Sequence, residues 1–575
     1  MSVEGRRPRS GARGGSSPPS DADARGDPSP GSGVRGGPPR WRSTATLAPP
    51  AVVSPTTVPS PLPRRNPTVP PSPCAVAEEQ LAGELDSVRP ALSAPYATAL
   101  PGARSAVLSR LWRALAHEPL PWIARRETSG GELTLHLTDG RRLHGPRADP
   151  YATAAYVDEV RLGTRAYDRA GDLMRALGVP HGTEFAGELD HGTASLALSR
   201  ADQPQDAAEP VTDWAWEQRV VDGHPYHPNC RSRQGFSVAE QLAYGPEHRQ
   251  VVRLGLVPVE DALVRGDWPA WLWDGGRPLI PVHPWQRAHV LGVPASEGPA
   301  AHPLMSLRTL ALAADGPHVK TALSARLTSS VRNISVRSVE TSRTVSDFVQ
   351  SVVTRTGAPL YVTRTLGAVS AHSPDLGAVL RESPAVHADP AAGERVVPVA
   401  ALPLTGLPSS PEWLAGFARL ALTAGLGLLE AGVALEAHGQ NLLVVLSSTG
   451  APRRLVYRDL ADIRVSPARL ARHGLRAPEL AARMVTDDET TLRRKLFGSL
   501  VAGALAATAG SAPALRAALE AAVRDLPHGP DLAALCRESL PAKALTLMRL
   551  TPRRSGDLWA RLPNPLVPQG DSYAP

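Results

Sequence analysis

The sequence predicts an α+β fold, and three observations support this. Apolar residues recur at helical spacing over 77–88 and 103–118. Alternating apolar and polar residues, the pattern of half-buried strands, cluster between 251 and 328. Beyond about residue 400 the spacing is helical again, except for one hairpin over 441–459. Strands that gather in one part of a chain, between stretches of helix, are typical of α+β proteins.

The first 75 residues are rich in proline, glycine, serine and arginine and contain almost no aromatic residues. Such a segment cannot bury enough apolar surface to offset the entropy lost on ordering, so we expect 1–75 to be a disordered tail. It holds ten arginines and four acidic residues, which account for six of the seven net positive charges of the chain. The remainder is nearly neutral, and we therefore expect no nucleic-acid partner.

The three cysteines, Cys74, Cys230 and Cys536, are odd in number and far apart. This usage favours a reducing compartment over a disulfide framework. The basic N-terminus has no apolar signal core, and the longest apolar stretch, 415–435, is interrupted by an arginine, a glutamate and four glycines. We therefore expect a buried helix there and a cytoplasmic protein with no membrane partner.

At 575 residues the chain is long for a single core, so we expect several domains after the tail. The first, 76–210, begins with the two helical segments and continues with a β-hairpin over 131–143, where Asp-Gly marks a tight turn. The second, 211–400, holds the strand-like runs 251–259, 277–283, 304–312 and 318–328. The third, 401–575, is the largely helical region.

The strand pair at 304–328 carries a polar face. An Asp-Gly turn at 315–316 predicts a hairpin, and the strand period of two gathers polar side chains on neighbouring faces. These side chains are Ser306, Arg308, Lys320, Ser324 and Thr328. Cations neutralise phosphate oxygens and hydroxyl groups orient them, so this face suits a polyanion. A solvated hairpin face is the alternative interpretation.

Lysine is scarce in this chain. Lysine and arginine together number 62, but only Lys320, Lys495 and Lys543 are lysines. Arginine can replace lysine wherever a solvated positive charge is enough, so a retained lysine indicates a need for a compact ammonium group. Lys320 lies on the polar strand face and Lys543 lies near the C-terminus. Lys495, in Leu-Arg-Arg-Lys-Leu-Phe, is interpreted as one more charge on a helix face.

The hairpin at 441–459 begins and ends with polar residues. Its strand–turn–strand length predicts that Asn441 and Asp459 lie side by side. An amide and a carboxylate oxygen in that position suit Mg²⁺, which shares its other positions with water and phosphate oxygens. The arrangement is similar to the metal-binding Asn and Asp of protein kinases. An ordinary hairpin with polar ends is the alternative.

The loop at 223–236 contains the spacing His224-x-x-His227-x-x-Cys230. A proline follows each histidine and no fourth ligand is nearby, so zinc is disfavoured. Two histidines followed by Arg231 and Arg233 fit contact with anionic substrate groups better, and a structural loop with capping histidines is the alternative. A further motif, Ile-Pro-Val-His-Pro-Trp-Gln at 280–286, is interpreted as a buried polar anchor.

Taken together, these motifs resemble the IucA/IucC (aerobactin-synthetase) family of NRPS-independent siderophore synthetases. The resemblance rests on the segments 223–236, 280–286, 306–309, 320–332, 436–441, 458–459 and 543–550. It implies a hand-shaped architecture with a thumb at 76–210, fingers with antiparallel sheets at 211–400 and a kinase-like palm at 401–575. Dimers are common in the family, so a homodimer is a further expectation.

The resemblance also implies an activity. Such an enzyme activates a carboxylate, citrate or a citrate- or succinate-derived acid, as an acyl-adenylate and joins it to an amine or hydroxyl, with release of AMP and pyrophosphate. It implies ATP and Mg²⁺ as cofactors and polycarboxylate and amine or hydroxylamine substrates. A small-molecule kinase, which would release ADP, and a non-catalytic protein of the same fold are the alternatives.

Site residues are implied as well. The residues matched to ATP binding are His224, Ser306, Arg308, Thr309, Lys320, Arg332 and Asn441. Those matched to the metal are Glu436, Asn441 and Asp459. Those matched to the acid are Thr328, Arg332, His438 and Lys543, and the catalytic residues are Arg332, His438 and Lys320. Two positions depart from the family pattern, since Arg231 replaces a usual lysine and Asn333 replaces a common threonine.

Overall fold

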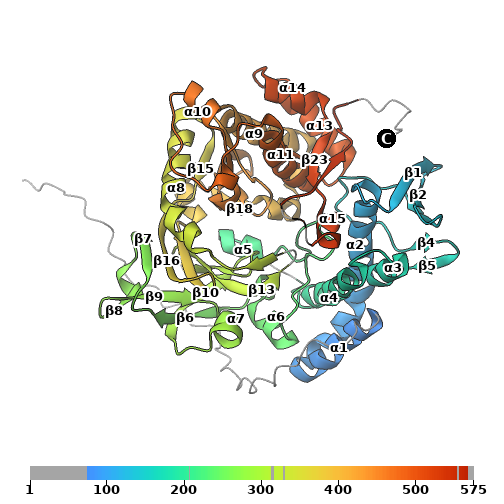
Figure 1. Cartoon of the computed structure of the whole chain (residues 1–575), viewed down its shortest axis with the longest axis horizontal. Coiled ribbons are helices and arrows are strands. Elements are labelled where there is room, and N and C mark those ends of the chain that lie inside the picture. The colour runs from blue at the N-terminus through green and yellow to red at the C-terminus, as the bar shows by residue number, and fades with distance from the viewer. Residues whose placement is uncertain are drawn as a thin grey trace, which may run out of the picture. The chain divides into compact units, whose positions relative to one another are not determined.

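The computed structural model describes residues 74–567 except 206–207, 313–315, 328–329, 553 and 555 (Figure 1). The expected disordered tail, apart from its last two residues, and Thr328 lie outside the described residues. The remainder mixes helices with mostly antiparallel sheets, which confirms the α+β class.

The N-terminal part combines helices with a five-stranded antiparallel sheet in the order β1-β2-β3-β4-β5. The helices are α1 (Cys74–Val88), α2 (Ser93–His117), α3 (Ala170–Leu177) and α4 (Gly182–Ala201). The strands are β1 (Ile123–Ser129), β2 (Glu132–Leu137), β3 (Arg142–Pro146), β4 (Val160–Leu162) and β5 (Arg165–Tyr167). Both predicted helices and the predicted hairpin are confirmed, and Gly140 has the positive φ of 87° that the tight turn requires.

A nine-stranded antiparallel sheet dominates the middle of the chain, in the order β7-β16-β17-β12-β11-β10-β6-β9-β8. Its first strands are β6 (Val252–Pro258), β7 (Leu263–Gly266), β8 (Trp273–Asp274), β9 (Arg277–Val282) and β10 (Ser296–Pro303). The others are β11 (Thr309–Leu312), β12 (His318–Thr321), β16 (Thr365–Ser373) and β17 (Leu376–Arg381). Short helices α5 (Asp213–Gln218), α6 (Val238–Tyr244) and α7 (Pro284–Gln286) precede or interrupt the strands.

The strand pair that carries the polar residues differs in part from the prediction. β11 and β12 pair as an antiparallel hairpin, with Thr309 opposite Lys320. However, β11 begins only at Thr309, because the hydroxyl of Ser306 accepts the Thr309 N–H at 3.1 Å and closes a turn. Leu307 in that turn has a φ of 65°. Ser306 and Arg308 are therefore turn residues and not members of one strand face.

The second predicted strand is broken as well. After β12 the chain enters β13 (Leu323–Leu327), which pairs with β14 (Ser330–Arg332) in a separate two-stranded sheet. Ser324 consequently leaves the polar face, since its hydroxyl donates to Asp375 at 2.6 Å and accepts from Gln286 at 3.0 Å. The expected grouping of Lys320 with Ser324 is wrong for this reason.

The C-terminal part is largely helical and surrounds a four-stranded sheet in the order β15-β21-β20-β18. The strands are β15 (Leu360–Val362), β18 (Arg395–Pro398), β20 (Leu442–Leu446) and β21 (Pro452–Tyr457). The main helices are α8 (Val336–Thr356), α9 (Pro411–Glu430), α10 (Pro467–Arg472), α11 (Glu489–Leu496), α12 (Ala506–Ala509), α13 (Ala512–Val523) and α14 (Pro530–Arg537). The predicted hairpin over 441–459 is confirmed as β20 and β21.

Helix α9 corresponds to the predicted apolar helix and packs against α13 and β21. By length and hydropathy it passes the test for a membrane span, and the bent stretch Glu489–Val523 passes it as a pair of helices. Half of the apolar window of α9 is nevertheless buried inside the fold, as in the core helix of a globular protein.

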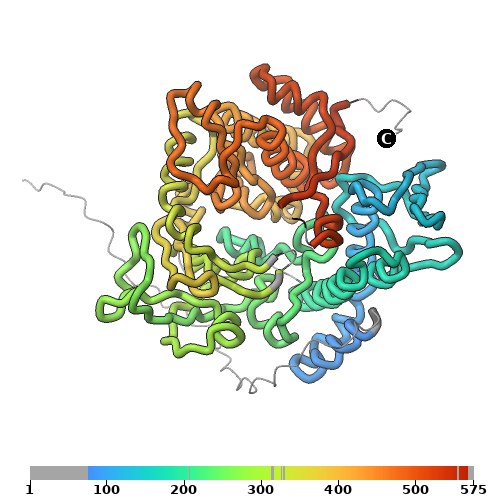
Figure 2. Tube along the Cα trace, in the orientation of Figure 1, coloured from blue at the N-terminus to red at the C-terminus, as the bar shows by residue number. Residues whose placement is uncertain are grey.

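The end of the chain returns to its beginning. β23 (Leu540–Lys543) pairs with β24 (Trp559–Leu562), and α15 (Leu545–Leu550) lies between them in sequence. Leu547 and Leu550 of α15 belong to the same hydrophobic cluster as α2 and α4. Figure 2 shows this C-terminal segment, in red, beside the blue and teal N-terminal helices. The contact holds the strand that carries Lys543 against the N-terminal part.

A buried carboxylate secures that contact. Glu118, at the end of α2, accepts the backbone N–H groups of Thr546 at 3.1 Å and Leu547 at 2.7 Å. Burial raises the pKa of Glu118 to about 7, although the two N–H groups and Arg113 act in the opposite direction. An acid whose pKa is higher folded than unfolded destabilises the fold as it ionises.

We therefore expect Glu118 to remove about 3 kcal/mol of stability as the pH rises from below 4.5 to above 7. Urea unfolding of wild type and Glu118→Gln at pH 5 and pH 8 measures this contribution. The variant lacks one acceptor and should be the less stable protein at pH 5, and the difference should shrink at pH 8. An unchanged difference between the two pH values would contradict the assignment.

Candidate active site

One cavity of about 990 Å³ lies where the three parts of the described chain meet. Its lining comes from α2, the 223–233 loop, the Ser306 turn, β12, the ends of the β20–β21 hairpin, α11 and the C-terminal segment. Thirteen lysines and arginines line it, against six aspartates and glutamates. Its volume is at the upper end of the range for small-molecule sites. The cavity thus suits a large anion or two anionic ligands.

The cavity brings together every expected site residue that the structure describes. These residues are His224, Ser306, Arg308, Thr309, Lys320, Arg332, Glu436, His438, Asn441, Asp459 and Lys543. They come from segments more than 300 residues apart in sequence.

Lys320 and Asp459 form the ionic centre of one end of the cavity. The ammonium group of Lys320 lies 2.7 Å from Asp459 Oδ2, and Arg381 donates to Asp459 Oδ1 at 3.0 Å. Burial and the charges of Arg381 and Arg308 lower the pKa of Lys320 to about 7, against the attraction of Asp459. The neighbouring cations hold the pKa of Asp459 well below its usual value. A phosphate group would offer these cations a further anionic partner.

Arg308 lies next to this ionic centre. Its guanidinium group donates to the carbonyl oxygens of Arg332 at 2.5 Å and Asn333 at 2.9 Å, which ties the Ser306 turn to β14. Burial lowers the pKa of Arg308 to about 10, so the group stays charged at neutral pH. The turn therefore presents a hydroxyl and a fixed cation to the same region.

The Asn441 end of the hairpin is held by Arg458 and by Glu217, a residue that the motif analysis missed. The side chain of Arg458 donates twice to the Gln440 carbonyl, at 3.0 and 2.8 Å, and once to Glu217 Oε1 at 2.6 Å. Glu217, on α5 and fully buried, also accepts the Met305 N–H at 3.0 Å through Oε2. One buried ion pair thus joins the Asn441 loop to the Ser306 turn. The sequence around Glu217 has no distinctive spacing that could have revealed this.

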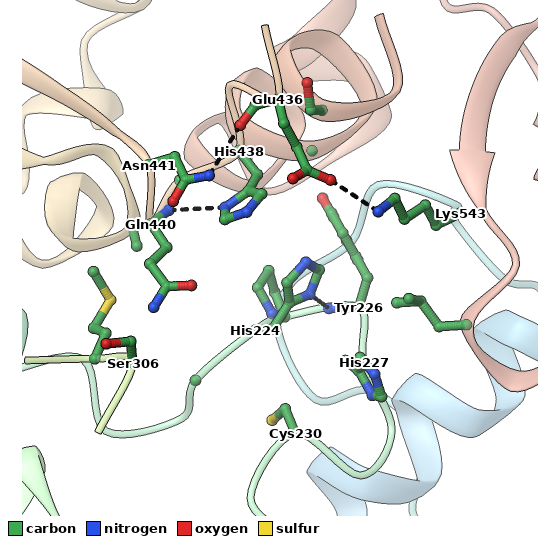
Figure 3. Close-up of a pocket in the computed structure, with 18 of the residues that line it drawn as sticks. His224, Tyr226, His227, Cys230, Ser306, Glu436, His438, Gln440, Asn441 and Lys543 are labelled. Atoms are coloured by element: carbon green, nitrogen blue, oxygen red, sulfur yellow. Dashed lines mark hydrogen bonds and ion pairs between the residues drawn. The ribbon is translucent and has the colours of Figure 1, made fainter. Parts of the chain in front are cut away.

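Two histidines present the same kind of donor to the cavity. His224 Nδ1 accepts the Tyr226 N–H at 3.2 Å, and His438 Nδ1 accepts the Gln440 N–H at 3.3 Å. Burial and neighbouring positive charges lower the pKa of His438 and hold that of His224 well below its usual value. A neutral ring that accepts through Nδ1 carries its proton on Nε2, so each histidine can donate to an anion. In Figure 3 both rings lie between Ser306 and Lys543.

Glu436 binds two lysines at the other end of the cavity. Its Oε1 lies 2.8 Å from Lys543 Nζ and 3.2 Å from Lys495 Nζ (Figure 3 shows the Lys543 pair). Lys495 also lies 2.6 Å from Asp462 Oδ2, and its side chain is 3% exposed. The interpretation of Lys495 as a solvated charge on a helix face is therefore wrong. All three lysines of the chain line this one cavity.

Models of two known protein families match parts of this chain. The model of the IucA / IucC family matches residues 212–403, and that of the ferric iron reductase FhuF-like transporter matches residues 411–558. The first match contains the Ser306 turn, Lys320 and Arg332. Residues 212–403 are thus similar to the IucA / IucC family.

Several curated proteins similar to this chain are named as ligases or synthases. The chain is 26% identical over 314 residues to the citryl-spermidine/3,4-dihydroxybenzoyl-citryl-spermidine:spermidine ligase of Bacillus anthracis. This alignment covers 43% of this chain and 50% of the relative. The chain is 23% identical over 365 residues to the D-ornithine–citrate ligase of Staphylococcus aureus, which covers 50% and 55%. The alignments therefore span about half the length of these relatives.

Solved structures share the fold more completely. The petrobactin biosynthesis protein AsbB of Bacillus anthracis has a TM-score of 0.68 at 18% identity, covering 83% of this chain and 98% of that one. The ATP-bound aerobactin synthetase IucA of Klebsiella pneumoniae has a TM-score of 0.63 at 19% identity, covering 81% and 99%. At these identities the likeness establishes the IucA / IucC fold.

The two arginines of the 223–236 loop make structural contacts. The guanidinium groups of Arg231 and Arg233 are buried and pair with Glu247, at 3.3 and 2.8 Å. They line the cavity wall, and the fully buried carboxylate that they share supports the structural alternative, while contact with an anionic substrate stays a prediction. The expected anchor role of His283 is confirmed, since its buried Nδ1 caps α7 by accepting the Trp285 N–H at 3.1 Å.

The groups expected to hold a metal have oxygen atoms to offer. Within the described part of the chain, Glu436 Oε2 and Asn441 Oδ1 accept no hydrogen bond, and the two oxygens of Asp459 accept one each. Among those same residues, no three His, Cys, Asp or Glu side chains are grouped to hold a metal. The donor set fits a hard cation such as Mg²⁺ that completes its coordination with ligand oxygens and water.

Proposed function

We propose that the protein is an ATP-dependent siderophore synthetase that adenylates a polycarboxylic acid and condenses it with an amine or a hydroxyl group. The observation that carries the proposal is the single cationic cavity that collects the expected residues from three parts of the chain. The ligase names of the curated relatives, with citrate, spermidine and ornithine in them, support it. In this proposal the regions 76–210, 211–400 and 401–575 act as thumb, fingers and palm.

The ATP phosphates are assigned to the end of the cavity near Lys320. Here the hydroxyl groups of Ser306 and Thr309 and the cations of Arg308 and Lys320 would bind phosphate oxygens, with His224 donating through Nε2. Repulsion between a carboxylate and the α-phosphate opposes their reaction, and preorganised cations lower that barrier. Lys320 would exchange part of its interaction with Asp459 for the phosphate, because a neighbouring anion favours its charged form.

The metal is assigned to Glu436 Oε2, Asn441 Oδ1 and Asp459. When bound there, Mg²⁺ would neutralise phosphate charge and orient the triphosphate.

The acid is assigned to the region between Arg332, His438 and Lys543, with Thr328 as a further expected contact. A carboxylate oxygen of the acid attacks the α-phosphorus of ATP. The bond between the α-phosphorus and the oxygen that bridges it to the β-phosphorus breaks, and pyrophosphate leaves. The nucleophile then attacks the acyl carbon, AMP leaves and the nucleophile loses a proton. Arg332 and Lys543 would hold the acid carboxylates, and His438 would donate through Nε2 to a substrate oxygen.

Product analysis tests the proposal. We expect the protein with ATP and Mg²⁺ to form AMP and pyrophosphate in equal amounts with one member of a set of acids, namely citrate, succinate and 2-oxoglutarate. Each acid is offered with a panel of polyamines and hydroxylated diamines. Because a kinase leaves ADP, nucleotide chromatography separates the two activities. ADP as the main product, or no pyrophosphate with any pair, would refute the assignment.

A further inference from the structure

We propose that Lys495 is a positioning residue for acid binding: through Glu436 it holds the ammonium group of Lys543 in place to receive a substrate carboxylate. This inference rests on the proposed function, because it takes the Lys543 end of the cavity as the place of the polycarboxylic acid. No family motif quoted above contains Lys495.

The contacts form a line of alternating charges along the cavity wall. Lys495 Nζ lies 2.6 Å from Asp462 Oδ2 and 3.2 Å from Glu436 Oε1. Lys543 Nζ lies 2.8 Å from the same oxygen of Glu436 and 3.2 Å from Asp557 Oδ2. The two ammonium groups therefore share one carboxylate oxygen, and each has a second carboxylate on its outer side.

Burial separates the roles of the two lysines. The side chain of Lys495 is 3% exposed and that of Glu436 is 14% exposed, whereas Lys543 is 33% exposed. Lys495 is thus the inner, anchored member of the line, and Lys543 is the member open to a ligand. An ammonium group has three N–H donors; Lys543 donates one to Glu436 and forms an ion pair with Asp557 at 3.2 Å. A donor therefore remains for an acid carboxylate.

A second contact fixes the same elements. The hydroxyl of Ser499, one turn after Lys495, donates to the Lys495 carbonyl at 2.7 Å and accepts the Ala437 N–H at 2.9 Å. It joins the backbone of the Lys495 turn to the residue that follows Glu436. The distance between the turn and the Glu436 loop is therefore held by backbone as well as by charge.

The balance of charges around Glu436 explains why the loss of Lys495 would weaken binding of the acid. Without Lys495, only Lys543 would compensate Glu436, and the carboxylate would draw that ammonium group toward itself and repel the incoming acid. Asp462 would stay compensated, because Arg464 and Arg483 each lie 3.0 Å from its Oδ1. Arginine is a poor substitute at this position, since its planar fork requires more room than an ammonium group between two carboxylates.

Because the chain contains only three lysines, NMR can follow each lysine side chain separately when citrate binds. Protein labelled with ¹³Cε-lysine has three side-chain signals, which Lys→Arg variants assign. Citrate is the probe, added without ATP or metal. We expect citrate to shift the Lys543 signal of the wild type, and Lys495→Met to weaken citrate binding by about tenfold, the effect of losing one oriented charge-assisted contact. The affinity for ATP should change by less than about threefold in this variant.

Arg493→Met is the matched control. Arg493 lies on the same helix, α11, and pairs with Asp531, which keeps Arg469 as a partner after the change. It does not line the cavity. Both variants lose one cation beside a carboxylate that is still compensated, so both should be somewhat less stable. Only Lys495→Met should weaken citrate binding.

Three results would overturn the inference: equal citrate affinity in wild type and Lys495→Met, an equal loss in Arg493→Met, or no shift of the Lys543 signal in the wild type. If Lys495→Met does not fold, Lys495→Arg replaces it, with an expected loss of about threefold, and wild-type affinity in that variant would overturn the inference. The proposed function fails separately, by the absence of AMP and pyrophosphate in the turnover assay.

Discussion

Lys320→Ala is expected to lower the rate of pyrophosphate release by about 10²–10³, the usual loss for one preorganised charge donor. The ammonium group lies at the ionic centre of the cavity, 2.7 Å from Asp459, and is assigned to the phosphates in the proposed function. The fold should survive the change, because Arg381 still compensates Asp459. Steady-state assays of pyrophosphate release, with thermal unfolding measured in parallel, give the two quantities.

Ser324→Ala provides the matched control for Lys320→Ala. Strand periodicity grouped both side chains on one face, but the hydroxyl of Ser324 binds Asp375 and Gln286 outside the cavity. We expect its turnover to stay within about threefold of the wild type, with a loss of stability of about 1 kcal/mol for the missing hydrogen bonds. Near-normal turnover in a folded Lys320→Ala protein would remove the phosphate assignment.

Glu217→Ala is expected to destabilise the protein by about 3–5 kcal/mol, the cost of leaving a buried charge without its partner. Glu217 is fully buried, and its loss would leave Arg458 without its ion-pair partner and the Met305 N–H without an acceptor. Urea unfolding measures the change in the free energy of unfolding. The variant should also bind ATP poorly, since the Ser306 turn loses the contact that holds it.

A double variant separates the two effects of this ion pair. Glu217→Met with Arg458→Met removes both charges, so much of the stability should return. ATP affinity should not return, because Arg458 no longer holds the Gln440 carbonyl beside Asn441. Full recovery of ATP affinity in the double variant would show that the pair contributes stability alone and does not position the site.

Several helices and strands could be predicted from the sequence because they depend on local periodicity. The helices near the N-terminus, the Asp-Gly hairpin and the β20–β21 hairpin all follow from spacing that neighbouring residues impose. The hairpin brings Asn441 opposite Arg458, the residue before Asp459, and this followed for the same reason, since the length of a hairpin sets its register. The strand pair near Lys320 was predicted less well. The residues alternate as in one continuous strand, but the Ser306 hydroxyl closes a turn before β11 and the sheet ends after β12, so the alternation does not place these side chains on one face.

Residue chemistry identified most of the candidate site before the fold was known. An ammonium group in an arginine-rich chain, a histidine loop and an Asn–Asp hairpin each point to anion or metal chemistry through side-chain type and local spacing. The roles of Lys495, Glu217 and Arg231 could not be read in this way. Each is set by an opposite charge from another segment: Glu436 for Lys495, Arg458 for Glu217 and Glu247 for Arg231.

Sequence alone therefore specified which chemical groups this chain can offer and the short segments that present them. Folding determined which opposite charge each charged side chain meets. Lys543 stays partly exposed in the cavity, Lys495 is buried against Glu436, and Arg231 and Arg233 pair with Glu247 in the cavity wall. The physical reason is that periodicity and turn chemistry act over a few residues, whereas the energy of a buried charge depends on whichever opposite charge the packed chain brings within about 3 Å.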